Sequence, residues 1–94
     1  MHVGTIKVYF YILSARSLKE KRQVVRSIKD KLRSRFNVSV AEIGSQDTWQ
    51  TGELGAAIVG NDHAYVNGIL EKVKEFLERN PAIRIIDHEI EVVL

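Results

Sequence analysis

The pattern of apolar and polar residues divides the chain into six segments. In four of them, apolar or β-branched side chains recur at every second position, which is typical of strands that bury one face. In the other two they recur at intervals of three and four, which is typical of helices with one apolar stripe. The pattern predicts strands over residues 5–13, 38–43, 54–59 and 83–94, and helices over residues 17–36 and between Asn61 and Pro81.

The order of these segments is strand, helix, strand, strand, helix, strand. Two helices that cover one face of a four-stranded antiparallel sheet are the simplest way to bury every apolar face in this order. The sequence therefore predicts an α+β, ferredoxin-like fold, with residues 1–94 forming a single domain. In that arrangement the first and third strands are central, and the loops at 14–17, 44–52 and 80–81 meet at one end of the sheet.

The sheet face turned away from the helices carries aromatic residues. Tyr9 and Tyr11 alternate with the core-facing apolar residues of the first strand, and the same alternation predicts Ile83 and Ile85 of the last strand on that face. Tyrosines on a central strand are typical of RNA-recognition sheets, but those sheets also need aromatics on the third strand, and residues 54–59 supply none. The sequence instead favours self-association through these four residues, because so apolar a face is seldom left in water.

The first predicted helix begins with a capping box. Ser17 can accept from the backbone N–H three residues on, and Glu20 can reach back to the N–H of Ser17. Lys21 falls on the apolar stripe of this helix, and Glu42 falls on the core face of the second strand near the same end. Because an unpaired buried charge is costly, we expect Glu42 to form a structural ion pair with Lys21, or failing that Arg22, within about 4 Å.

Charge is unevenly distributed along the chain. Residues 16–35 contain nine basic and two acidic residues, a local charge of +7, whereas the whole chain has a net charge of +2. Many of the cations recur at intervals of three and four, which places them in a row along one flank of the helix. Such a row fits the phosphates of a nucleic acid and fits a solvated helix face equally well; an acidic protein partner is a third option. The candidate phosphate contacts are Arg16, Lys19, Arg22, Arg26, Lys29 and Arg33.

Several runs of residues resemble one bacterial family. They are LKEKR at 18–22, RFNVSVAE at 35–42, and Asp47, Trp49 and Gln50. Over most of the chain the sequence is similar to the YlxP-like family of small uncharacterised bacterial proteins. The resemblance implies a ferredoxin-like fold and carries no activity, cofactor or catalytic residue. Because family members are often encoded near genes for translation and ribosome maturation, it also implies an RNA or ribosome partner.

The sequence offers little for catalysis. It has no cysteine and no glycine-rich phosphate loop, and His2, His63 and His88 stand far apart without a second metal ligand at helical spacing. We therefore expect no metal, no cofactor and no enzymatic activity. Asp47 and Trp49 in the polar loop are candidates for a small-molecule pocket, although a turn residue beside a tryptophan that covers the core edge explains them more simply.

These observations favour a binding protein of the cytoplasm. The chain shows no segment long and apolar enough to span a membrane, and the absence of cysteine favours a reducing compartment. The leading hypothesis is a non-enzymatic RNA- or ribosome-associated protein that binds through the basic first helix. The alternative is a homo-oligomeric regulatory or scaffold module, with or without a small ligand, that associates through the open sheet face.

Overall fold

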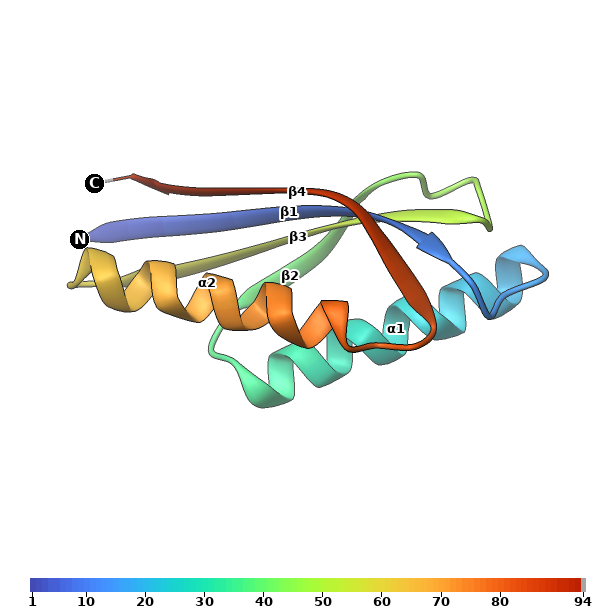
Figure 1. The fold of residues 1–94 in the computed structure, drawn as a ribbon, viewed down its shortest axis with the longest axis horizontal. Coiled ribbons are helices and arrows are strands. Elements are labelled where there is room, and N and C mark those ends of the chain that lie inside the picture. Colours follow the sequence, from blue (N-terminus) through green and yellow to red (C-terminus); the bar gives the residue numbers. More distant parts are fainter. Residues whose placement is uncertain (94) are drawn as a thin grey trace.

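Four antiparallel strands form one sheet, and both helices cover the same face of it (Figure 1). The computed structural model describes residues 1–93. The strands lie in the order β2-β3-β1-β4, so β1 and β3 are central as predicted, and the ferredoxin-like α+β fold is confirmed. In chain order the elements are β1 (His2–Ile12), α1 (Leu18–Arg35), β2 (Ser39–Gly44), β3 (Thr51–Gly60), α2 (His63–Glu78) and β4 (Ile83–Val93).

The two central strands are longer than the apolar alternation predicted. β1 begins at His2 rather than at residue 5, and β3 begins at Thr51 rather than at residue 54. The two strands pair continuously, from His2 opposite Gly60 to Tyr11 opposite Thr51. The backbone hydrogen bonds between strands need no apolar side chain. The alternation of apolar residues could therefore not show where these two strands begin. The last predicted strand also included Leu94, which lies outside the described residues.

The core lies between the sheet and the two helices. Every second residue of β1 points into it, and apolar residues at three- and four-residue spacing on both helices close it from the other side. Lys21 is the polar exception, with 1% of its surface exposed. The largest fully buried apolar side chains are Phe10, Ile6, Ile28, Leu32, Leu70, Leu77, Val66 and Val73.

Both helices begin with a side-chain cap. Ser17 Oγ accepts from the Glu20 N–H at 3.1 Å, as the capping box predicted. The reciprocal bond differs from the prediction, because Glu20 Oε1 accepts from the backbone N–H of Arg16 at 2.7 Å rather than from that of Ser17. The carboxylate therefore fixes the residue before the cap. At α2, Asp62 Oδ1 accepts from the Ala64 N–H at 3.0 Å, so the aspartate is the cap of that helix.

A bulge in β4 corrects the predicted faces of that strand. The register shifts between Tyr9 and Phe10 of β1, which leaves Ile86 of β4 as an extra residue. Beyond an extra residue, the side chains of a strand point to the opposite faces from those that strict alternation predicts. Ile83 is consequently 5% exposed in the core, and Ile85 packs against the core half-buried. The placement of Ile83 and Ile85 on the open face was wrong, and they cannot form an oligomer interface there.

Three loops meet at one end of the sheet, as predicted. The Ile12 N–H donates to the Gln50 carbonyl at 2.7 Å, and the Leu13 N–H donates to the Ala82 carbonyl at 2.8 Å. These bonds join the end of β1 to the loop after β2 and to the turn before β4. The two helices run in opposite directions along the long axis, and their C-terminal ends lie near each other (Figure 1). There the rings of Phe36 and Phe76 meet edge-on, with centroids 6.1 Å apart.

Candidate nucleic-acid interface

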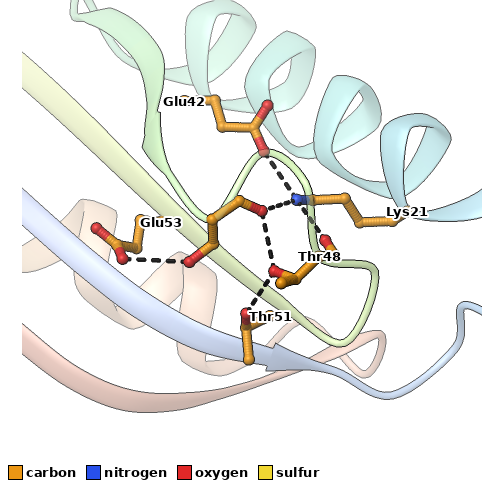
Figure 2. Close-up of polar contacts among 6 residues, drawn as sticks. Lys21, Glu42, Thr48, Thr51 and Glu53 are labelled. Carbon is orange, nitrogen blue, oxygen red and sulfur yellow. Dashed lines mark hydrogen bonds and ion pairs between the residues drawn. The ribbon is translucent and has the colours of Figure 1, made fainter. Parts of the chain in front are cut away.

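The buried ammonium group of Lys21 ties the start of α1 to the loop between β2 and β3 (Figure 2). Lys21 Nζ donates to the carbonyl of Ser45 at 2.6 Å and to that of Thr48 at 2.8 Å. The same atom lies 3.0 Å from Glu42 Oε2, so the predicted ion pair is present. The side chain of Lys21 is 1% exposed and that of Glu42 is 20% exposed, so the pair is largely shielded from water.

The contact between Lys21 and Glu42 is a charge contact rather than an aligned hydrogen bond. Glu42 Oε2 is buried and has no hydrogen-bond partner of good geometry within residues 1–93. The two loop carbonyls take well-aligned N–H groups of the ammonium, and the carboxylate balances its charge from a further side. An ammonium group has three donors and no acceptor. All three groups around it come from β2 and the loop that follows, so the arrangement is a structural anchor.

Hydroxyl groups close the loop that Lys21 holds. Thr48 Oγ1 donates to the Ser45 carbonyl at 3.1 Å and lies 2.9 Å from Thr51 Oγ1. Ser45 Oγ donates to Glu53 Oε1 at 3.2 Å (Figure 2). Ser45 has a φ of 59°, in the left-handed region that few residues other than glycine adopt. The bonds from Lys21 and Thr48 to its carbonyl help to hold this uncommon conformation.

Asp47 and Trp49, the candidate loop site, lie on the surface of this loop. Asp47 is exposed and Trp49 is 38% exposed. Within the described part of the chain, neither side chain forms a hydrogen bond or an ion pair. The loop is fixed instead by the backbone carbonyls of Ser45 and Thr48, which accept hydrogen bonds from Lys21. Because every residue has a backbone carbonyl, the sequence could not indicate these two.

Five of the six candidate phosphate contacts form a row along one side of α1, and the sixth, Arg16, directly precedes the helix cap. We call the six residues the basic flank. All of them are exposed except Lys29, which is half-buried. This side of α1 faces the free edge of the sheet, because Arg33 in the row reaches the edge strand β2. The basic flank consists of Arg16, Lys19, Arg22, Arg26, Lys29 and Arg33.

Arg33 has a structural role that the other members of the row do not show. Its Nη2 donates to the Val40 carbonyl at 2.9 Å, and its Nη1 lies 3.9 Å from Asp30 Oδ1. β2 is an edge strand, and an outward carbonyl on such a strand is open to pairing with another chain unless something covers it. The guanidinium group of Arg33 covers this carbonyl, so only part of the guanidinium group is free to contact a ligand.

The other five members of the basic flank have no carboxylate partner in the part of the chain that the structure describes. The ion pairs there are Lys21–Glu42, Arg33–Asp30 and Lys74–Glu71. From Lys19 to Lys29 the row extends over about 15 Å at the rise of an α-helix. The side chains of these five cations therefore form no ion pair in that part of the chain, and the nearby carboxylate of Glu20 binds the backbone N–H of Arg16.

The open sheet face has the opposite character around its aromatic centre. Tyr9 lies between Glu53 of β3 and Asp87 of β4. Further along the same face, β4 adds Glu89 and Glu91. These four carboxylates outnumber the two cations beside them, Lys7 opposite Glu89 and Arg84 opposite Tyr11. Carboxylates beside the tyrosine repel phosphates, so this face is a poor platform for RNA. Of the two surfaces considered from sequence, the basic flank is the one whose charge suits a nucleic acid.

A second group of cations was not among the predicted site residues. Lys31 and Arg35 lie on the opposite side of α1 from the basic flank, and they face Lys72 and Arg79 of α2 across a hollow between the helix ends. The helical period places Lys31 and Arg35 on that side of α1. Sequence spacing could not show which element packs beside it, so the hollow was missed.

Two of the three histidines meet in space although they are far apart in sequence. The rings of His2 and His63 lie with centroids 5.7 Å apart and nearly perpendicular. Even so, residues 1–93 contain no group of three or more His, Cys, Asp or Glu side chains that could hold a metal ion. None of the helices described is long and apolar enough to cross a membrane.

Comparison with known proteins identifies the family. Residues 3–90 match the family described as "Protein of unknown function (DUF503)". The chain is also 38% identical over 81 residues to a protein of Bacillus subtilis (strain 168) named "Uncharacterized protein YlxP", over 86% of this chain and 88% of that protein. Both matches agree with the resemblance seen in the LKEKR and RFNVSVAE runs. The chain therefore belongs to the DUF503 family of YlxP-like proteins, whose function is not established.

Proposed function

We propose that this protein binds RNA, without enzymatic activity, through the basic flank of α1. The proposal rests on five neighbouring cations whose side chains form no ion pair in the described residues: Arg16, Lys19, Arg22, Arg26 and Lys29. Unneutralised cations in a row gain affinity for a polyanion by releasing the counterions condensed on it.

The second helix shows what an ordinary solvated helix face looks like in this protein. Its outer residues mix both signs, and Lys74 Nζ pairs with Glu71 Oε2 at 3.4 Å, one turn away. Such mixing supports solubility without a strong field in any direction. The basic flank lacks this mixing, which favours a polyanionic partner over plain solvation.

The fold presents the basic flank on a rigid support. Lys21 anchors the first turn of α1, and Arg33 anchors the last turn to the edge strand. A row held at both ends needs little reordering on binding, which lowers the entropic cost of association. Contacts of this kind hold the phosphate backbone in place and read no bases, so we expect affinity with little sequence preference.

Filter binding to ribosomal RNA tests the proposal, because the family resemblance implies a ribosomal or RNA partner. The variant Arg22→Ala/Arg26→Ala removes two charges from the centre of the basic flank. Lys7→Ala/Arg84→Ala removes the same charge from the open sheet face and is the control. We expect at least a tenfold loss of affinity for the first variant and less than a twofold change for the control. Absence of binding at low salt, or equal losses in both variants, would rule the proposal out.

A second candidate, compatible with the first, is self-association through the open sheet face. It rests on the exposure of apolar side chains there, with Tyr11 at 48%, Ile43 at 47% and Val59 at 59%. Beside Ile43 the face has a shallow hollow of about 350 Å³, lined mostly by apolar atoms of β1, β2 and β3. A second copy of this chain could cover these side chains and the hollow together.

Sedimentation velocity at micromolar protein tests this second candidate with a matched pair of variants. Tyr11→Glu places a charge on the open face, and Tyr65→Glu places the same charge on the exposed side of α2, where Tyr65 is 57% exposed. We expect the wild type and Tyr65→Glu to form oligomers, and Tyr11→Glu to be a monomer. A monomeric wild type ends the candidate.

A further inference from the structure

The C-terminal ends of α1 and α2 enclose a hollow that we call the helix groove. Its volume is about 900 Å³, within the range of small-molecule sites and too small for a duplex. Three of its lining residues come from the end of α1 and its cap, four come from α2 and its cap, and the turn that follows α2 supplies the rest. The residues from the two helices and their caps are Lys31, Arg35, Phe36, Lys72, Glu75, Phe76 and Arg79.

The helix groove is strongly cationic. Four basic side chains line it against one carboxylate, Glu75. None of the four forms an ion pair within residues 1–93. Both helices end at the groove, with caps at Phe36 and Arg79, and each helix end contributes about half a negative charge. With four cations, one carboxylate and two helix ends, the net charge at the groove is about +2. The basic side chains therefore outweigh the negative ends of the two helix dipoles.

The floor of the groove is aromatic. The Arg35 guanidinium lies over the Phe76 ring, 5.0 Å from its centroid. Phe36 meets the same ring edge-on, with centroids 6.1 Å apart. Both phenylalanines are half-buried, so part of each ring borders the hollow. Planar guanidinium groups and exposed aromatic rings are the surfaces on which nucleic-acid bases stack.

We propose that the helix groove binds a nucleoside phosphate. Lys31, Lys72 and Arg79 hold the phosphate groups, and the base lies against Arg35 and Phe36. The combination of cations, a flat apolar surface and a volume of this size fits a phosphate joined to a planar ring better than inorganic phosphate alone. The nucleoside phosphate comes either from a free nucleotide or from the end of an RNA strand.

This proposal stands apart from RNA binding by the basic flank. The groove residues of α1 lie on the opposite side of the helix from Arg22 and Arg26, and the groove also needs residues of α2. A protein that fails to bind ribosomal RNA through the flank can therefore still bind a nucleotide in the groove. Likewise, a protein that binds no nucleotide in the groove can still bind RNA through the basic flank. The two proposals are therefore tested by different variants.

Isothermal titration calorimetry at low salt provides the test, with four probes: ADP, pyrophosphate, adenosine, and a short single-stranded RNA with a terminal phosphate. We expect ADP or the RNA to bind, pyrophosphate to bind at least fivefold more weakly than ADP, and adenosine not to bind measurably. If the RNA alone binds, loss of that binding in Lys31→Ala/Lys72→Ala but not in Arg22→Ala/Arg26→Ala assigns the strand end as the source. The opposite pattern places the RNA on the basic flank and overturns the proposal. Pyrophosphate binding as tightly as ADP, or no binding by ADP and the RNA at millimolar concentration, overturns the proposal.

Two groove variants and one control locate the binding site. Lys31→Ala/Lys72→Ala removes two exposed cations and should weaken ADP binding about tenfold. Arg35→Lys keeps the charge but loses the planar group, so ADP binding should fall severalfold while pyrophosphate binding stays within twofold. Arg22→Ala/Arg26→Ala removes the same charge from the basic flank and should leave ADP binding unchanged. Equal losses in the lysine variant and in this control contradict the proposal.

Discussion

Lys21 Nζ lies 3.0 Å from Glu42 Oε2, inside the apolar stripe that α1 turns to the sheet. The lysine is as buried as the isoleucines and leucines around it, yet its ammonium reaches two carbonyls of the loop after β2. An apolar residue at this position would pack against the sheet and leave those carbonyls without their partner. The pair therefore connects three parts of the molecule: the helix start, the edge strand and the loop that carries Trp49.

Replacing Lys21 by methionine should lower the free energy of unfolding by about 2–4 kcal/mol, because a partly buried carboxylate and two carbonyls lose their partner. Chemical denaturation followed by the fluorescence of Trp49, the one tryptophan of the sequence, measures the effect and the mobility of the loop. Lys19→Met, at an exposed position of the same helix turn, is the control and should stay within about 0.5 kcal/mol of wild type. Equal stability of the two variants would show that the ammonium does not hold the loop.

The substitution Glu42→Gln should cost about 1–2 kcal/mol of stability and leave RNA affinity within twofold. The amide keeps the size of the side chain but cannot balance the charge of Lys21, and Glu42 is not part of the basic flank. Denaturation curves and filter binding on the same preparation separate the two effects. A loss of RNA affinity without a loss of stability would mean that Glu42 acts at a ligand site.

Two glycines should respond to alanine with opposite signs. A Cβ at Gly52 would lie 2.7 Å from ring atoms of the fully buried Phe10, whereas nothing lies within 4 Å of a Cβ at Gly68 in α2. Gly52→Ala should therefore destabilise by about 1–3 kcal/mol through overpacking. Gly68→Ala should stabilise by about 0.5–1 kcal/mol, because alanine favours the helix. Thermal unfolding of both variants checks the pair, and a shift of the same sign in both would contradict the packing described.

Arg33→Ala should lower stability by about 1 kcal/mol, because the Val40 carbonyl on the edge strand loses its donor. Arg26→Ala, which removes a member of the same flank without a described contact, should leave stability within about 0.5 kcal/mol. Denaturation curves of the two variants make the comparison. If both variants have the stability of wild type, the bond between Arg33 and the edge strand contributes nothing to folding.

The sequence was sufficient for the features that depend on periodicity and topology. The 3.6-residue period placed Lys21 on the inner face of the first helix, and the strand period placed Glu42 opposite it. The βαββαβ order then brought the loop after β2 to the start of α1. Because each step follows from chain geometry, the ion pair between Lys21 and Glu42 could be predicted before any contact was seen.

Other features depend on details that periodicity does not contain. The bulge at Ile86 reverses the faces of Ile83 and Ile85, and a single extra residue leaves no clear mark in an apolar strand. The helix groove needs Lys31 and Arg35 to face Lys72 and Arg79, which depends on how two helices cross the sheet. The bond from Arg33 to Val40 similarly needs the edge of the sheet to be located first.

The salt dependence of RNA binding shows whether the basic flank contacts phosphates. Each phosphate contact adds about 0.7 to the slope of log affinity against log salt concentration for a single strand. Arg22→Ala/Arg26→Ala should therefore reduce the magnitude of the slope by about 1.4, while Lys7→Ala/Arg84→Ala should leave it unchanged. We expect this difference between two variants of equal net charge, because only the first loses phosphate contacts. The same slope in wild type and in both variants would show that the basic flank does not contact the RNA.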